Sequence, residues 1–261
     1  MTVLLEKRRL IVSPGLVPTP LRREDKFGHP QNVDVDLTIA LINNMPDPAL
    51  QATERQFMRL LRQAAGDIRI DFHCFSLPSV RRSQPAKWRL EAQYTDIADI
   101  ERLHIDGLIV TGAEPSTATL SEETFWRDLT NIVEWAKRNT RSTIWSCLAA
   151  HAAVLHLDGI ERKRIETKCS GIYDCLKVSN HWLTEGLAQP FKVAHSRLNE
   201  IRADDLTAHG YQLLTQSVQG GVTGTAEQKR TPIADRTERQ VIQIQQARIG
   251  VLDDVLDVRR A

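Results

Sequence analysis

Hydrophobic and polar positions along the chain alternate in blocks that predict strands, each followed by a helix. Residues 37–43 form a continuous apolar run, which is typical of a buried strand in a parallel sheet. From 52 to 64 apolar residues recur at helical spacing, and Gly66 is well placed to end that helix. Residues 68–75 and 106–111 have the pattern of two further strands. This part of the chain is therefore predicted to form repeated strand–helix units.

The same alternation continues in the middle of the chain. Ser121, followed by two glutamates, is a favourable start for a helix with one apolar face. A short strand is predicted over 142–146, a helix over 148–155 and a later strand over 191–194. Strands that alternate with helices favour right-handed β-α-β units, so the predicted fold class is α/β, a doubly wound, mostly parallel sheet with helices on both faces. In such sheets ligand-binding residues lie at the carboxyl ends of the strands.

Three segments are predicted from these patterns. Residues 1–35 carry four prolines among charges and are predicted to form an irregular N-terminal arm. Residues 36–221 hold the α/β domain. Residues 222–261 are predicted to form a divergent or truncated tail, in which the polar stretch 223–230 does not have the pattern of a strand.

Composition excludes several classes of function. The chain is 41% hydrophobic and 26% charged with a net charge of +1, so nothing favours nucleic acid or an anionic membrane as a partner. No apolar run approaches the roughly 20 residues of a membrane span, and the first ten residues lack a signal-peptide pattern, which predicts a cytoplasmic protein. The four cysteines form no Cys-x-x-Cys pair, so neither a disulfide scaffold nor a zinc site is expected.

Cys147 is the strongest candidate for a nucleophile. It stands where a predicted strand turns directly into an alanine-rich helix. A thiol at a helix N-terminus meets the positive end of the helix dipole, which favours thiolate, and the unpaired N–H groups there can hold the oxyanion of an acyl intermediate. The small residues after it let the helix approach the sheet, as in the nucleophile elbow of hydrolases. The alternative is a buried structural cysteine, which is the commoner fate of a free thiol.

Residues 142–155, with the pair Gly159-Ile160, resemble the nucleophile segment of the homoserine O-acyltransferase (homoserine O-succinyltransferase) family. Four other stretches agree with that family in order and spacing. They are Ile39 to Pro46 with Glu54, Gln56 and Arg59-Leu-Leu61; Leu108 to Ala113; Lys168-Cys-Ser-Gly171; and His195-Ser-Arg197. The resemblance extends over about residues 36–218.

The resemblance implies a flavodoxin-like fold of the class I glutamine amidotransferase type and ping-pong acyl transfer in methionine biosynthesis. Cys147 is expected to form a thioester with the acyl group of acyl-CoA, and the hydroxyl of L-homoserine is expected to accept that group. Acyl-CoA is then a co-substrate, no cofactor or metal is required, and a homodimer is suggested.

The resemblance also implies roles for individual side chains. Lys168 and Ser196 fall on substrate-binding positions of the family, and Arg197 is placed to bind a carboxylate. Lys168 also reads as a solvated lysine near the basic run 162–164, and Arg197 as half of a structural ion pair. Ser116 falls on the position associated with acyl-donor choice, where a small residue favours succinyl over acetyl.

One part of the family pattern is missing. The family places its general base and an orienting acid in a Gly-His-Pro-Glu-Tyr segment, expected here near residue 239, but no histidine follows His209. His151 lies one helical turn after Cys147, although a cysteine in the first turn points away from the helix. For His195 and His209 a structural role is the commoner one. The alternatives to the acyltransferase are therefore a catalytically impaired or regulatory relative and a glutamine amidotransferase-like hydrolase.

Overall fold

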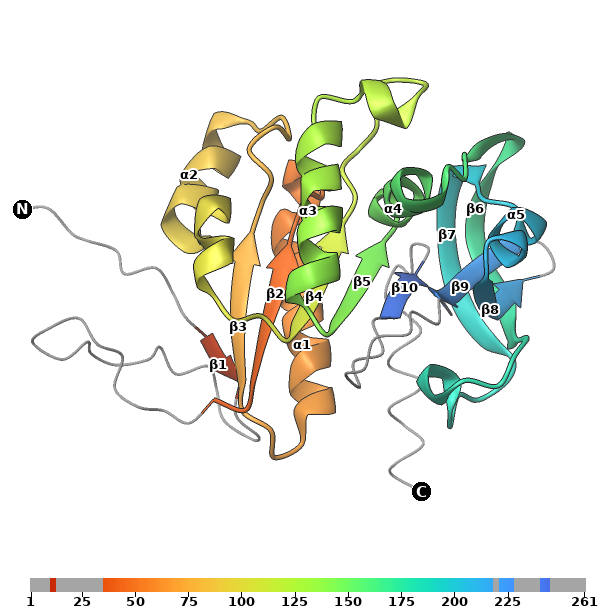
Figure 1. Ribbon diagram of the computed structural model, residues 1–261, viewed down its shortest axis with the longest axis horizontal. Coiled ribbons are helices and arrows are strands. Elements are labelled where there is room, and N and C mark those ends of the chain that lie inside the picture. The colour runs from red at the N-terminus through yellow and green to blue at the C-terminus, as the bar shows by residue number, and fades with distance from the viewer. Residues whose placement is uncertain (1–9, 13–34, 218–220, 228–239, 245–261) are drawn as a thin grey trace, which may run out of the picture. The chain divides into compact units, whose positions relative to one another are not determined.

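The computed structural model describes residues 10–12, 35–217, 221–227 and 240–244. The chain divides into two compact units, residues 1–141 and 142–261 (Figure 1), and each is described by itself. The predicted base segment near residue 239 and most of the predicted N-terminal arm lie outside the described residues.

The sheet of the first unit is parallel except at one edge. β2 (Leu37–Ile42) lies in the middle and runs parallel to both β3 (Ile70–Phe75) and β4 (Gly107–Thr111). A short strand inside the predicted arm, β1 (Leu10–Val12), runs antiparallel along β3. β4 is buried along its whole length, as expected for a strand covered on both faces.

Helices cover both faces of this first sheet, α1 on one and α3 on the other (Figure 1). The predicted end of α1 at Gly66 is confirmed, since that glycine is the C-cap with a φ of +55°. The helices of the unit are α1 (Leu50–Ala65), α2 (Gln84–Gln93) and α3 (Trp126–Asn139), with 3-10 turns η1 (Asp47–Ala49), η2 (Ile97–Arg102) and η3 (Leu120–Glu122).

The second unit combines one parallel strand pair with an antiparallel sheet. β5 (Ser142–Ser146) pairs in parallel with β10 (Gln240–Ile244), and antiparallel strands follow in the order β9, β8, β6, β7. The other elements are α4 (Leu148–Asp158), β6 (Lys163–Lys177), η4 (Trp182–Thr184), β7 (Phe191–Glu200), α5 (Ala203–Ala208), β8 (Tyr211–Ser217) and β9 (Gly221–Glu227).

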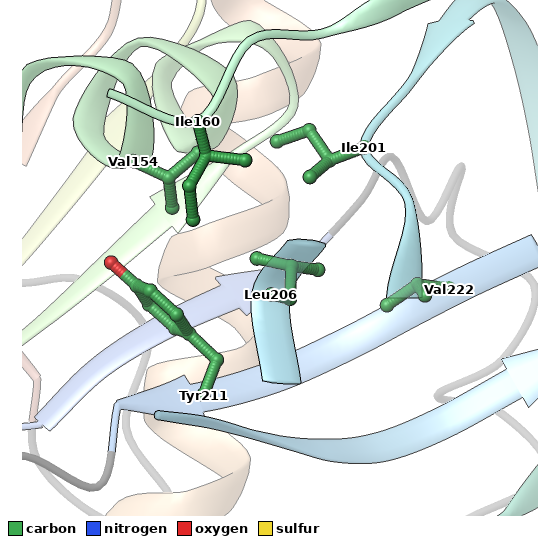
Figure 2. Close-up of a cluster of buried hydrophobic side chains, with 6 residues drawn as sticks. All are labelled: Val154, Ile160, Ile201, Leu206, Tyr211 and Val222. Carbon is green, nitrogen blue, oxygen red and sulfur yellow. The ribbon is translucent and has the colours of Figure 1, made fainter. Parts of the chain in front are cut away.

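A buried cluster fixes α4 within this unit. Val154, in the second half of α4, and Ile160, just after the helix, belong to one cluster with Leu206 of α5 and Tyr211 of β8 (Figure 2). The hydroxyl of Tyr211 donates a hydrogen bond of 2.6 Å to the carboxylate of Asp158, the last residue of α4. The C-terminal end of α4 is therefore held by both apolar and polar contacts.

The α/β fold class is confirmed, but the expectation that residues 223–230 contain no strand is wrong. β9 covers most of that stretch and pairs on both sides, with β8 and with β10. Its threonines explain how a polar sequence forms a strand: Thr223 and Thr225 are buried, and Thr223 Oγ1 donates to Thr215 Oγ1 at 2.8 Å. The predicted boundaries at 35 and 221 stay predictions.

Candidate active site

Cys147 occupies a sharp turn between strand and helix. β5 ends at Ser146 and α4 begins at Leu148, and Cys147 between them has φ +60° and ψ −128°. Among the described residues it is the one non-glycine residue with positive φ. Such a conformation costs about 1–3 kcal/mol and is typical of functional positions. The predicted nucleophile elbow is confirmed as a structural feature.

The start of α4 packs closely because its residues are small. Ala149, Ala150 and Ala153 are completely buried, and Ala152 is nearly so. Small side chains allow the helix backbone to approach its neighbours, so its N-terminus can be held directly beside the thiol. In this first turn the N–H of Ala150 donates to the carbonyl of Cys147 at 3.1 Å. The N-terminal turn of a helix is where backbone N–H groups can bind an oxyanion.

Burial works against the thiolate that the helix N-terminus was expected to favour. Burial raises the pKa of the Cys147 thiol above its ordinary value, and the N–H of Leu148, which donates to the sulfur, lowers it by less. The thiol therefore stays protonated near neutral pH in the free chain. Attack on an acyl donor needs a base or a bound substrate that takes up this proton.

The parallel partner of β5 ends beside the elbow. Ile244, the last residue of β10, pairs with Ser146, which directly precedes Cys147. A residue at the carboxyl end of β10 is thus about one strand spacing, ~5 Å, from the elbow backbone. The next two residues in the sequence, Gln245 and Gln246, carry amides, which are not general bases. These two residues lie outside the described ranges.

The substrate-binding residues predicted from the resemblance come together on the β6–β7 hairpin. Cys169 pairs with Arg197 and Ser170 pairs with Ser196, so Lys168 is next to the pair that contains Arg197. The register shifts between Arg164 and Cys169, which places Lys168 in an irregular part of β6. The structure therefore brings Lys168, Ser196 and Arg197 into one region.

These residues nevertheless do not share one face. Neighbouring residues of a strand point to opposite faces, and Ser196 is exposed whereas the side chain of Arg197 is only 10% exposed. Lys168 is exposed as well. Ser196 and Arg197 thus point in opposite directions, and their reach to the Cys147 thiol stays a prediction.

Arg197 faces the buried side of the hairpin. Its guanidinium lies 3.6 Å from the carboxylate of Glu200 and contributes to lowering the pKa of His151 on α4. Gly221 leaves room for it, because a Cβ there would meet Arg197 Nη2 at 2.8 Å. Arg197 is therefore within electrostatic reach of the helix that carries Cys147 at its start.

The two buried histidines of this unit are weak bases. Burial, with the positive charge of Arg197 among the lesser causes, lowers the pKa of His151 to about 3 and that of His195 to about 4. Efficient general bases have a pKa near the working pH. His151 and His195 are neutral at pH 7, but each is poorly suited to take a proton from a thiol or a hydroxyl.

The same pKa shifts predict a loss of stability in acid. The unfolded chain binds protons on these histidines below pH 6.5 whereas the folded chain does not, so stability falls as the pH is lowered from about 6.5 toward 4. His195 makes no hydrogen bond through either ring nitrogen to any described residue. Replacing it by leucine therefore leaves no hydrogen-bonding group unsatisfied. In urea unfolding, the free energy of unfolding of His195→Leu should fall by about 2 kcal/mol less than that of the parent when the pH is lowered from about 7 to about 5.

The matched control is His104→Gln, because the His104 side chain is 81% exposed. This variant should lose stability with pH as the parent does. An unchanged pH dependence in His195→Leu would contradict the assignment of acid sensitivity to His195.

Sequence reasoning missed the residues that hold together the carboxyl ends of the strands in the first unit. Asn44, after β2, receives a hydrogen bond of 3.0 Å from the N–H of Leu77 and donates to the carbonyl of Thr111 at the end of β4. Arg82, with 3% of its side chain exposed, donates to the carbonyls of Asn43 and Met45. Nothing in the local pattern around Arg82 distinguishes it from a solvated arginine.

Ser116 lies in the loop that follows β4, in the first unit. Its hydroxyl donates to the buried carboxylate of Glu123 at 2.8 Å. The residue predicted to select the acyl donor is thus hydrogen-bonded to an acidic side chain that the sequence did not single out.

The described residues contain no group of three or more His, Cys, Asp or Glu side chains able to hold a metal ion. Within the same residues, no helix has the length and apolar character needed to cross a membrane.

The α/β fold of this chain is similar to that of solved glutamine amidotransferase-type proteins. A GMP synthase protein from Thermoplasma acidophilum is similar with a TM-score of 0.54 at 17% identity, over 86% of this chain and 98% of that one. A glutamine amidotransferase from Thermotoga maritima is similar with a TM-score of 0.50 at 11% identity, over 80% and 74% of the two chains. At these identities the likeness concerns the fold alone.

Sequence comparison defines the family. Residues 24–236 match the homoserine O-succinyltransferase family. The homoserine O-succinyltransferase of Bradyrhizobium japonicum is 52% identical over 85% of this chain and 67% of its own length, and that of Rhodopseudomonas palustris is 49% identical over 88% and 69%. The homoserine O-succinyltransferase of Methylorubrum extorquens is 44% identical over 74% of this chain and 57% of its own length. The chain belongs to the homoserine O-succinyltransferase family of acyltransferases, and the resemblance stated from the motifs is confirmed.

Proposed function

We propose that this chain transfers a succinyl group from succinyl-CoA to the hydroxyl of L-homoserine, in methionine biosynthesis, through a thioester on Cys147. Family membership supports the reaction, and the strained elbow at Cys147 is the observation that supports this residue as the nucleophile. A buried structural cysteine has no need of a backbone conformation that costs about 1–3 kcal/mol.

The first half-reaction forms the acyl-enzyme. Cys147 Sγ attacks the thioester carbonyl of succinyl-CoA, its proton leaves with coenzyme A as the free thiol, and the carbonyl oxygen becomes an oxyanion before the C–S bond to CoA breaks. N–H groups in the first turn of α4 can donate to that oxyanion. In the second half-reaction the homoserine oxygen attacks the new thioester, loses its proton to a base, and Cys147 is released as the thiol.

Cationic side chains on the β6–β7 hairpin suit substrates with carboxylates. We assign Lys168 and Arg197 to carboxylate binding and Ser196 to a hydrogen bond with the substrate. We assign the choice of acyl donor to the loop around Ser116, with succinyl preferred to acetyl. Acyl-CoA is the co-substrate, no separate cofactor is used, and a homodimer in the cytoplasm is the expected state.

Intact-mass measurement after exposure to succinyl-CoA tests this function. A succinyl adduct on Cys147 that persists alone and is lost when homoserine is added supports acyl transfer. Rapid loss of the adduct without homoserine indicates a hydrolase instead. No adduct at all would overturn the proposal and favour a regulatory relative.

A further inference from the structure

A single carboxylate holds the loop after β4. Glu123 is 4% exposed, and its Oε1 accepts hydrogen bonds from the N–H of Ser116 at 2.6 Å and from the N–H of Thr117 at 2.7 Å. Its Oε2 accepts from the hydroxyl of Ser116 at 2.8 Å. Both oxygens of one buried carboxylate are thus used to fix two consecutive loop residues.

Glu123 is itself held in place at the beginning of α3. Its N–H donates to the carbonyl of Leu120 at 3.2 Å, and its carbonyl accepts from the N–H of Trp126, the first residue of α3, at 3.0 Å. The loop is therefore hydrogen-bonded to a carboxylate whose own backbone is fixed at the start of α3, a helix that packs on the sheet (Figure 1).

These hydrogen bonds favour a charged Glu123. Burial alone raises the pKa of a carboxyl group, but the N–H and hydroxyl donors of Ser116 and Thr117 outweigh burial, and the pKa of Glu123 lies below its ordinary value. Charge-assisted hydrogen bonds from N–H groups are about twice as strong as neutral ones. The loop conformation therefore depends on an ionised group that a neutral side chain of the same size does not replace.

We propose that Glu123 is the positioning residue for acyl-donor selection, because it fixes the backbone of Ser116 and Thr117. This inference rests on the proposed function, which places donor selection in this loop. Ser116 donates its hydroxyl proton to Glu123, so it offers a donor's carboxylate no proton of its own. Donor choice is then made by the shape of the loop, and Glu123 sets that shape.

The test compares Glu123→Gln with the control Glu122→Gln. Glutamine keeps the size of Glu123 but turns an NH₂ group toward donors, whereas Glu122 is the exposed neighbour. The measurement is the single-turnover rate of Cys147 acylation by succinyl-CoA and by acetyl-CoA, followed by intact mass. We expect the ratio of the two rates to fall by about tenfold or more in Glu123→Gln, since a misplacement of about 1 Å caused by a mutation far from the chemistry can cost about 10²-fold. Glu122→Gln should keep the parent's ratio.

The ratio of the succinyl-CoA rate to the acetyl-CoA rate distinguishes donor selection by Glu123 from a purely structural role. Partial unfolding would lower both rates together and leave their ratio unchanged. A ratio within about twofold of the parent's, in a folded Glu123→Gln, would overturn the inference while the proposed function stands. If Glu123→Gln does not fold, Glu123→Asp provides the same test, because it keeps the charge but is too short to hold both residues. If the parent is acylated by neither donor, the proposed function fails and this inference fails with it.

Amide hydrogen exchange gives a readout that does not depend on activity. The N–H groups of Ser116 and Thr117 should exchange slowly in the parent and in Glu122→Gln, and at least about tenfold faster in Glu123→Gln, because each has lost an ionised acceptor. Equal exchange in all three proteins would show that Glu123 does not hold the loop.

Discussion

Replacing Cys147 by alanine should abolish the covalent adduct formed with succinyl-CoA and any transfer to homoserine. The proposed reaction passes through a bond to the Cys147 sulfur, and removal of a catalytic nucleophile costs on the order of 10⁴–10⁶-fold in rate. The measurement is intact mass after incubation with succinyl-CoA, with peptide mapping of the parent to locate the adduct. An adduct of equal yield in Cys147→Ala would contradict the assignment, and Cys175→Ala, at a buried thiol on β6, is the matched control.

The variant Cys147→Gly separates the effect of losing the thiol from the effect of backbone strain at this position. Cys147→Gly loses the thiol just as alanine does, but glycine adopts φ +60° without cost. We expect Cys147→Gly to be more stable than Cys147→Ala by about 1–3 kcal/mol in urea unfolding. Equal stability of the two variants would show that the elbow stores no strain. The elbow would then lose its value as evidence for function.

The elbow could be predicted from the sequence because it follows from local patterns. An apolar strand that ends at Ser146, with an alanine-rich helix directly after Cys147, leaves no residues for a longer loop. The single residue between the two elements then has to make the whole change of direction, and its positive φ follows from that. Local periodicity likewise identified β2, β4 and α1 near their observed bounds.

The antiparallel sheet of the second unit could not be predicted in this way. β9 is rich in threonine and glycine, and it becomes a strand because β8 and β10 supply hydrogen-bond partners on both sides. Exposed and buried residues of β6 do not alternate regularly through its first half, where a shift of register interrupts the pairing. Pairing between residues distant in sequence decides these strands, and no local pattern reports it.

The sequence predicted which residues gather in the candidate site, but not which way their side chains point. Family motifs gave Lys168, Ser196 and Arg197 as a group, and the β6–β7 hairpin brings them together. The motifs could not show that Ser196 and Arg197 point to opposite faces, because that depends on strand register. The sequence does not single out Glu123, because a glutamate in a polar stretch before a helix is usually solvent-exposed. Its role becomes visible only through its three hydrogen bonds in the structure.

Turnover of this chain with succinyl-CoA and homoserine should be slow, about 10²–10⁴-fold below ordinary enzyme rates of ~1–10³ s⁻¹. Cys147 has a raised pKa, and the homoserine hydroxyl must lose its proton when it attacks the thioester. No histidine follows His209 in the sequence, and β10, which ends beside the elbow, is followed by glutamines. The steady-state rate of O-succinylhomoserine formation is the quantity to measure.

The two half-reactions should respond differently to pH. Acylation needs the Cys147 thiolate, so its rate should still be rising at pH 9.0, the ordinary pKa of a thiol, because the pKa of Cys147 lies above that value. The thioester should then accumulate, because the two buried histidines described in this unit, His151 and His195, are poor bases for deacylation. Turnover in the ordinary range would contradict this expectation and require a base within the chain. The variants His151→Ala and His195→Ala would then identify it. Burial is the main cause of their low pKa values of about 3 and about 4, so such a base would have to become more basic when substrate binds.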